Sequence, residues 1–166
     1  MFVFETNYGS FTVELDFANA PISSKNFQNY ADSGFYDGKN FHRVNNDFMI
    51  QGGGFDPGLT QKSTEESIEN EANNGLSNEL GTLAMARTAD PHSASSQFFI
   101  NVSDNFFLDH KDTSSQGWGY AVFGKVVEGM DTINKIKECK TGSQLGHQDV
   151  PEEDVLISSV KRIEEA

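Results

Sequence analysis

The sequence is poor in cysteine and in basic residues, and each shortage excludes a class of protein. A single cysteine, Cys139, rules out an internal disulfide and favours a reducing compartment, which predicts a cytoplasmic location. Twelve basic residues against 25 acidic residues leave a formal net charge of −13. A surface of this charge repels phosphate backbones and anionic bilayers, so we expect neither a nucleic-acid partner nor a membrane partner.

Long apolar runs are also missing. No stretch approaches the ~20 apolar residues that a membrane helix needs, and the first ten residues, MFVFETNYGS, lack the basic region of a signal peptide. The chain has 166 residues, of which 36% are hydrophobic. Length and composition therefore predict one globular domain over residues 1–166, and we expect it to be a monomer.

The motifs of most standard chemistries are absent. No Gly-Lys-Ser/Thr follows the glycine triplet Gly52–Gly54, so a bulge or a close backbone approach explains it better than a phosphate loop. Cys139 stands outside any reactive motif and reads as a structural residue. We expect no metal and no cofactor, because the four histidines lack ligand spacing. These histidines are His42, His92, His110 and His147.

Short alternating segments dominate what is present. FVFETN and FTVELDF predict a hairpin, and a helix is expected to begin at Pro21 and another to cover MDTINKIKEC. Residues 56–81 and the stretch TGSQLGHQDVPEE are polar and predict loops. With seven or eight short strands and no alternation of strand and helix, the pattern favours one antiparallel barrel or sandwich. The further strands are expected in NFHRV, FMIQG, GTLAMAR, QFFINV, YAVFGKVV and DVLISSVKRI.

One arginine stands inside an apolar run, in the stretch FHRVNNDFMIQGG at residues 41–53. Burying a guanidinium costs free energy unless it has partners or a task, so Arg43 needs an explanation. Alternation along FHRVNN places Phe41 and Arg43 on one face, and alternation along FMIQG places Met49 and Gln51 together.

Further polar and apolar side chains fall on related faces. Phe48 and Ile50 share the opposite face of FMIQG unless the chain bends, and Gln97 and Phe99 share a face of QFFIN. A face with an arginine, two glutamines and two apolar side chains is too polar for a core and too apolar for ordinary surface. Two readings stay open at this point, namely an arginine buried and held by two glutamines, or a binding cleft.

Four motifs in this order resemble those of the cyclophilins, which are peptidyl-prolyl cis-trans isomerases. They are FHRVNNDFMIQGG, GTLAMAR, SQFFI and VFGKVVEGMD. The likeness covers nearly the whole chain, and the segments NEANNGL and QGWGY are most similar to bacterial cytosolic members. The resemblance implies a mainly β fold, a closed eight-stranded antiparallel β-barrel capped by two α-helices. It also implies an enzyme that accelerates isomerisation of X-Pro bonds and needs no cofactor.

The resemblance assigns the catalytic role to Arg43, with Gln51 and Phe99 beside it. The proline pocket then matches the side chains Phe48, Met49, Phe99 and Leu108. Gln51 and Gln97 match the glutamines that position the arginine and line the groove.

The remaining assignments lie along the groove. Ala86 and Arg87 fall where the family's backbone holds the residue before proline, although an asparagine is usual at position 87. Phe107 replaces a tryptophan that is common in the family, and Tyr120 replaces a histidine. Because phenylalanine has no N–H donor, weak binding of cyclosporin is expected.

The expected partners are proline-containing peptides and unfolded protein clients. Two alternatives remain. One is a prolyl-peptide binding module that acts as a chaperone without useful turnover. The other is a ligand-carrying barrel of the lipocalin type, although small closed barrels are usually filled by their own side chains.

Overall fold

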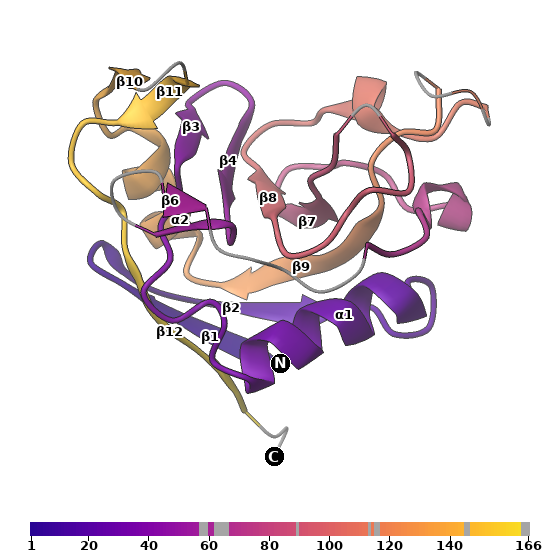
Figure 1. Ribbon diagram of the computed structural model, residues 1–166, viewed down its shortest axis with the longest axis horizontal. Coiled ribbons are helices and arrows are strands. Elements are labelled where there is room, and N and C mark those ends of the chain that lie inside the picture. Colours follow the sequence, from indigo (N-terminus) through magenta and orange to yellow (C-terminus); the bar gives the residue numbers. More distant parts are fainter. Residues whose placement is uncertain are drawn as a thin grey trace.

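The computed structural model is mainly β, and its described residues form two α-helices and two short 3-10 helices. Figure 1 shows how these elements are arranged. It describes residues 1–56, 60–61, 67–88, 90–112, 114, 117–144 and 147–163.

Eight strands form one antiparallel sheet in the order β12-β1-β2-β9-β7-β8-β4-β3. The strands are β1 (Phe2–Thr6), β2 (Gly9–Leu15), β3 (Arg43–Asn45), β4 (Met49–Gly52), β7 (Thr82–Met85), β8 (Phe98–Asn101), β9 (Val122–Glu128) and β12 (Ile157–Arg162). The hairpin of β1 and β2 and the strand-rich reading are confirmed.

Closure of the barrel is not confirmed. The sheet curls through 226° as a half-barrel, and no strand pairing joins the edge strands β3 and β12 within the described part of the chain. β3 has only three residues. The residues that precede β3 contact the segment that precedes β12, at the opposite edge of the sheet. There the Phe41 amide donates to the Val155 carbonyl at 2.9 Å, and Asn40 forms an isolated bridge with Leu156.

The two faces of the sheet have different neighbours. On β4 and β8, Ile50, Phe98 and Ile100 join the main core, whereas Met49 and Phe99 belong to a second apolar cluster. The register places Gln51 opposite Phe99. We call the face that carries Met49, Gln51 and Phe99 the groove face. The expectation that Met49 and Gln51 share a face is therefore confirmed.

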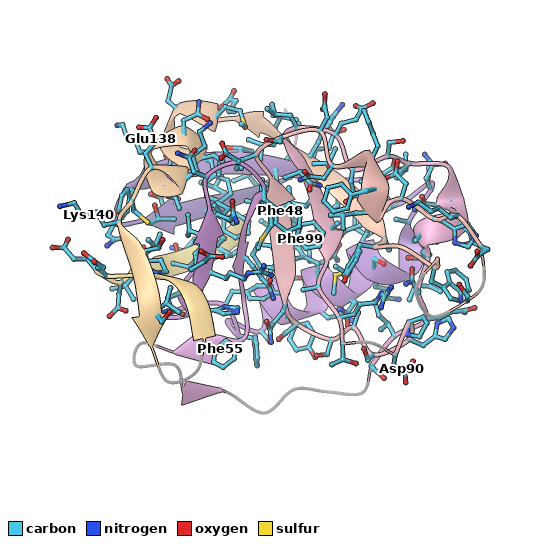
Figure 2. The ribbon with its side chains drawn as sticks, turned by 90° about the horizontal axis from the view of Figure 1, so that it is seen from above. Phe48, Phe55, Asp90, Phe99, Glu138 and Lys140 are labelled. Atoms are coloured by element: carbon cyan, nitrogen blue, oxygen red, sulfur yellow. The ribbon has the colours of Figure 1, made fainter. Side chains whose placement is uncertain are left out.

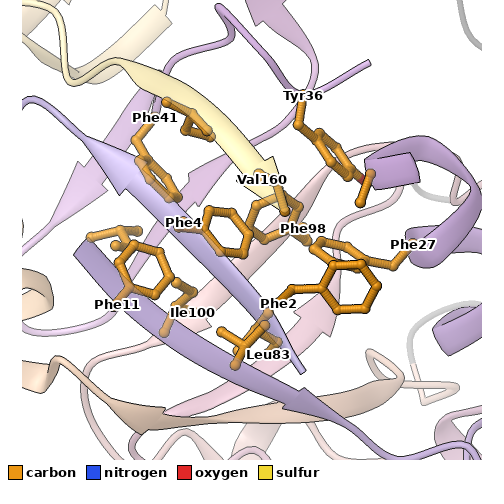
Figure 3. Packing of buried hydrophobic residues seen from close by; sticks show 14 of the residues in the cluster. Phe2, Phe4, Phe11, Phe27, Tyr36, Phe41, Leu83, Phe98, Ile100 and Val160 are labelled. Atoms are coloured by element: carbon orange, nitrogen blue, oxygen red, sulfur yellow. The ribbon is translucent and has the colours of Figure 1, made fainter. Parts of the chain in front are cut away.

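Aromatic rings fill the main core (Figure 3). Phe98 lies at its centre, with ring centroids 5.7 Å from Phe4, 5.5 Å from Phe27 and 6.1 Å from Phe41. Each well-placed aromatic pair is worth ~0.5–1.5 kcal/mol beyond the area it buries. The expectation that Phe41 shares a face with Arg43 is wrong, because Phe41 precedes β3 and points into this core.

Helix α1 (Pro21–Asp32) covers the core beside β9 and β12. Proline at its first turn suits the fixed φ of that residue, and the Glu71 carboxylate accepts hydrogen bonds from the amides of Ile22 and Ser23. That contact satisfies amides that a helix start otherwise leaves unpaired. Helix α2 (Met130–Lys137) buries Ile133 and Ile136 against the core. Both predicted helices are confirmed.

Two pairs of short strands occur where loops were expected. β10 (Thr141–Gln144) pairs with β11 (His147–Pro151), and β5 (Phe55–Asp56) pairs with β6 (Thr60–Gln61). The 3-10 helices are η1 (Ala72–Asn74) and η2 (Phe106–Leu108). No helix among the described residues is long and apolar enough to cross a bilayer.

Candidate active site

A cavity of about 260 Å³ opens beside the groove face. Nine of the eleven residues predicted for the site line it, namely Arg43, Phe48, Met49, Gln51, Ala86, Arg87, Phe99, Leu108 and Tyr120. Figure 2 shows Phe48 and Phe99 beside each other near the middle of this side of the molecule, whereas Phe55, Asp90 and Lys140 lie at its periphery. Residues from five separate stretches of sequence thus converge on one hollow.

Arg43 reaches the cavity from the edge strand β3 and is half-buried. Its guanidinium carbon lies 5.9 Å from the centre of the Phe48 ring. Among the described residues, no hydrogen bond or ion pair engages its guanidinium. A guanidinium has five N–H donors, so Arg43 offers them to whatever enters the cavity. The reading of an arginine held by two glutamines is therefore wrong.

The two glutamines bond to each other instead. Gln51 Nε2 donates to Gln97 Oε1 at 3.0 Å, and Gln51 stands opposite Arg43 in the register of β3 and β4. Gly54 makes room for this pair, because a Cβ at that position would collide with the Gln97 side chain. The close approach predicted for the glycine triplet is confirmed. That the glutamines position Arg43 stays a prediction.

Apolar side chains form the floor and wall of the cavity. Met49 and Phe99 are almost fully buried, with 2% and 4% of their surface exposed. The Phe99 ring meets the Tyr120 ring edge-on at 5.7 Å, and Leu108 packs against the same cluster. Phe48 belongs to this cluster and not to the core beside Ile50, because β4 begins only at Met49 and the chain bends before it.

The other end of the cavity carries a second arginine. Arg87 Nε donates to the Gly119 carbonyl at 3.1 Å, and its Nη1 donates to the Thr88 carbonyl at 2.8 Å. The guanidinium carbon lies 4.5 Å from the centre of the Tyr120 ring, which is a cation–π contact. Ala86 beside it is tied to the neighbouring strand by a hydrogen bond from its amide to the Gln97 carbonyl.

Two predicted residues lie outside the lining. Gln97 touches the cavity through its hydrogen bond with Gln51. Phe107 stands on η2 with 62% of its surface exposed and stacks on Phe48 at 5.7 Å. It forms an apolar rim next to the cavity.

A buried asparagine network supports the cavity and was not predicted from the sequence. Asn105 donates to the Phe48 carbonyl and to Asn101 Oδ1, both at 2.8 Å. Asn101 donates in turn to Asn78 Oδ1 at 3.1 Å, and Asn78 donates to Asp109 Oδ1 at 3.0 Å. These bonds fix η2 against β8. Buried amides need hydrogen-bond partners. Several asparagines in a stretch that forms the core could therefore have indicated such a network.

A larger hollow of about 640 Å³ lies over β2 and β9, lined in part by Glu14, Phe17 and Lys125. None of the eleven residues predicted for the site lines it, so size alone does not make it the candidate site.

The residues whose pKa is raised by burial lie away from the cavity. Burial raises the pKa of Tyr36, whose hydroxyl donates to the Ser96 carbonyl, and burial also raises the pKa of Cys139. Neither residue lines the cavity. Among the described residues, no three His, Cys, Asp or Glu side chains are grouped to hold a metal ion.

The chain is similar to known proteins over almost its whole length. Residues 1–162 match the family model described as cyclophilin type peptidyl-prolyl cis-trans isomerase. The chain is 58% identical to peptidyl-prolyl cis-trans isomerase B of Escherichia coli, covering 96% of this chain and 98% of that protein. It is also 58% identical to peptidyl-prolyl cis-trans isomerase cyp18 of Streptomyces antibioticus, covering 94% of each chain.

A solved structure is similar in fold. It is a cyclophilin type peptidyl-prolyl cis-trans isomerase of Cryptosporidium parvum in the presence of the dipeptide Ala-Pro, with a TM-score of 0.83 and 29% identity over 99% of both chains.

Proposed function

We propose how this chain, which belongs to the cyclophilin-type peptidyl-prolyl cis-trans isomerase family, catalyses its reaction. Arg43 stabilises the twisted X-Pro bond while the apolar wall of the cavity holds the proline ring. The observation that carries the proposal is that one hollow joins the Arg43 guanidinium, which no described residue engages by a hydrogen bond or ion pair, with the buried side chains of Met49 and Phe99.

The reaction needs differential binding and no covalent step. An X-Pro amide is held planar by resonance with a barrier of ~18–20 kcal/mol, and unaided isomerisation takes tens to hundreds of seconds. At the twisted midpoint conjugation is lost and the prolyl nitrogen regains a lone pair. A guanidinium that donates to this nitrogen binds the twisted state more tightly than either planar state, which is the condition for catalysis.

Each part of the cavity has a role in this scheme. Met49, Phe99 and Leu108 hold the ring, so that the rest of the peptide rotates about a fixed proline. Gln51 and Gln97 orient the peptide backbone and limit where Arg43 can point. Ala86 and Arg87 lie along the segment that precedes proline, and Tyr120 and Phe107 form the rim.

Unfolded proteins are the proposed clients, because an open cavity at the surface accepts a proline within a longer chain. A monomer in the cytoplasm is also part of the proposal. The single cysteine suits a reducing compartment, and a net charge of −13 disfavours self-association and binding to nucleic acid or anionic membranes.

Nuclear magnetic resonance with a short Ala-Pro peptide tests the proposal. Exchange peaks between the cis and trans peptide should appear with catalytic amounts of protein, and shifts of protein resonances should centre on Met49, Phe99 and Leu108. Binding without exchange would favour the chaperone alternative. Shifts centred on the hollow over β2 and β9 would place the site elsewhere. Uptake of an apolar small molecule without any effect of the peptide would favour the lipocalin-type alternative.

A further inference from the structure

The hollow of about 640 Å³ over β2 and β9 has no part in the proposed reaction. Apolar side chains form part of its lining, among them Phe17, Leu76 and Val122. Phe17 follows the end of β2, and 46% of its surface is exposed. Covering an exposed ring removes apolar surface from water, so an apolar group that enters the hollow is stabilised there.

Three carboxylates and one ammonium group also line this hollow. They belong to Glu14, Asp16, Glu79 and Lys125. Among the described residues, no hydrogen bond or ion pair engages the side chains of Glu14, Glu79 or Lys125, although Lys125 stands opposite Glu14 in the register of β2 and β9. The hollow therefore carries a net negative charge, which favours a cationic group on whatever enters it.

Asp16 is held in place by neutral partners. Its two carboxylate oxygens accept hydrogen bonds from the side-chain and backbone amides of Asn19, both at 3.0 Å. These bonds, the one from the side chain first, lower the pKa of Asp16. Because neutral amides do not cancel its charge, this carboxylate adds to the negative field of the hollow at neutral pH.

The hollow and the cavity of the proposed site lie on the same face of the sheet. Ala84 of β7 pairs with Phe99 of β8 on one side and with Val122 of β9 on the other. Phe99 lines the cavity and Val122 lines the hollow. All three residues belong to the apolar cluster of the groove face, and Leu76 packs against that cluster. The two sites are therefore neighbours, with only β7 between the strands that carry Phe99 and Val122.

The spacing of the strands sets how much peptide joins the two sites. Neighbouring strands lie about 4.8 Å apart, so in the order β2-β9-β7-β8 the strands β9 and β2 are roughly 10 and 14 Å from β8. An extended chain covers at most ~3.3–3.6 Å per residue. The proposed function places the residue before proline beside Ala86, just after β7, so the preceding residues lead away from Arg43 and toward β9. The residues three and four positions before proline therefore reach the hollow.

We propose that the hollow over β2 and β9 binds the client chain ahead of the proline and selects a lysine or arginine beside an apolar residue. The inference rests on the proposed function, which fixes the direction in which the peptide leaves the cavity. The apolar residue contacts Phe17 and Leu76, and the cationic group meets the carboxylates of Glu14 and Glu79. A client held there keeps its proline at a high effective concentration beside Arg43. The hollow thus selects clients and takes no part in the isomerisation step.

The first experiment measures kcat and KM for peptides of one length that differ only at the third and fourth positions before proline. The pair of residues there is leucine with lysine, leucine with glutamine, or leucine with glutamate. The wild type should rank the peptides in that order. Partly exposed ion pairs are worth up to ~1 kcal/mol, so kcat/KM should be about 5-fold higher for the lysine peptide than for the glutamine peptide at low salt.

The difference should lie in KM and leave kcat nearly unchanged, because the hollow binds the planar and the twisted peptide alike. A protein carrying both Glu14→Gln and Glu79→Gln should bring the ratio of lysine to glutamine peptide close to 1 and keep wild-type activity on a short Ala-Pro peptide. The matched control carries Glu5→Gln and Glu128→Gln, two exposed carboxylates of the same sheet that line neither site. This control should keep the wild-type ratio.

Three results would overturn the inference. One is a wild-type ratio of 1 or less. Another is an equal fall of the ratio in both doubly substituted proteins, which would show that only the net charge of −13 attracts the basic peptide. The third is a ratio that the substitutions at Glu14 and Glu79 leave unchanged.

Nuclear magnetic resonance separates this inference from the proposed function. A leucine–lysine peptide with alanine in place of proline has no X-Pro bond, yet it should shift the resonances of Leu76 and Val122. Absence of these shifts would also overturn the inference, and they decide alone if the protein substituted at Glu14 and Glu79 does not fold. Failure of the proposed function looks different, because no proline peptide would then be isomerised while the shifts at Leu76 and Val122 would remain.

Discussion

The side-chain amide of Gln51 donates a hydrogen bond of 3.0 Å to the side-chain oxygen of Gln97, across strands that are far apart in sequence. Gln97 can occupy this position only because residue 54 is glycine, since a Cβ there would overlap the Gln97 side chain. The glycine at position 54 therefore controls the arrangement of a polar pair at the edge of the cavity.

Gly54→Ala should displace Gln97 and break its bond with Gln51. A lost neutral hydrogen bond is worth ~0.5–1.5 kcal/mol, so we expect kcat/KM to fall by about 2- to 10-fold while the protein stays folded. Gly142→Ala is the control, because a Cβ on that exposed glycine meets nothing within 4 Å. Equal activities of the two variants would show that the glutamine pair has no part in catalysis.

Phe98 and Phe99 are neighbours in sequence that face opposite sides of β8. Phe98 packs in the main core and Phe99 lines the cavity. Phe99→Leu should therefore lower peptide affinity and kcat/KM more than it lowers the melting temperature. Phe98→Leu should do the reverse, because a change of shape in a packed core is destabilising.

Thermal melts and kinetics on the same two preparations measure both effects. If the two variants lost activity in proportion to their loss of stability, Phe99 would have no role in the site beyond packing.

Much of this site could be predicted from the sequence. Prediction succeeds within strands and fails for residues that precede a strand or meet through the order of strands. Alternation predicts the groove face of β4 and β8, because side chains of a strand point to opposite faces. It does not place Phe48, which precedes β4 and turns back over the cavity. Met49 and Arg87 line the same cavity because of the strand order, which alternation along a single strand does not give.

The hairpin of β10 and β11 was expected as a loop because its residues are polar and include glycine. Residue preference is weak evidence for or against a strand, because pairing of the backbone with a neighbouring segment can make a polar stretch extended. The side-chain hydrogen bonds of Asn101 and Asn105 could not be predicted from alternation either. The segment Asn101–Ser103 matches the sequence of an N-glycosylation site, but Asn101 is fully buried.

Phe107→Trp should make the enzyme more sensitive to cyclosporin. Phe107 is an exposed rim residue stacked on Phe48, and a tryptophan there would add an N–H donor and apolar area. A hydrogen bond of ~0.5–1.5 kcal/mol and about 1 kcal/mol of apolar contact predict inhibition that is about 10- to 100-fold tighter. Inhibition constants for the two proteins measure this. Tight inhibition of the wild type that Phe107→Trp leaves unchanged would show that position 107 does not set affinity for the drug.

Cys139 should react slowly with thiol reagents. Burial raises the pKa of this thiol, so at neutral pH a smaller fraction is thiolate than for a free cysteine, and the thiolate is the reactive form. The rate of modification should increase as pH rises and should increase strongly when the protein is unfolded in urea. A folded-state rate equal to that of the unfolded chain would contradict the assignment of a shielded, structural cysteine.

The measurement that tests the central claim most directly is kcat/KM and peptide Kd for Arg43→Ala on a short Ala-Pro peptide, with Arg162→Ala as a surface control. Removing one preorganised donor to a transition state typically costs ~2.7–4 kcal/mol, so kcat/KM should fall by about 10²–10³. The Kd should change far less, because Arg43 acts on the twisted bond and not on the planar peptide. An Arg43→Ala variant that stays folded, binds the peptide normally and isomerises it at nearly the wild-type rate would contradict this account.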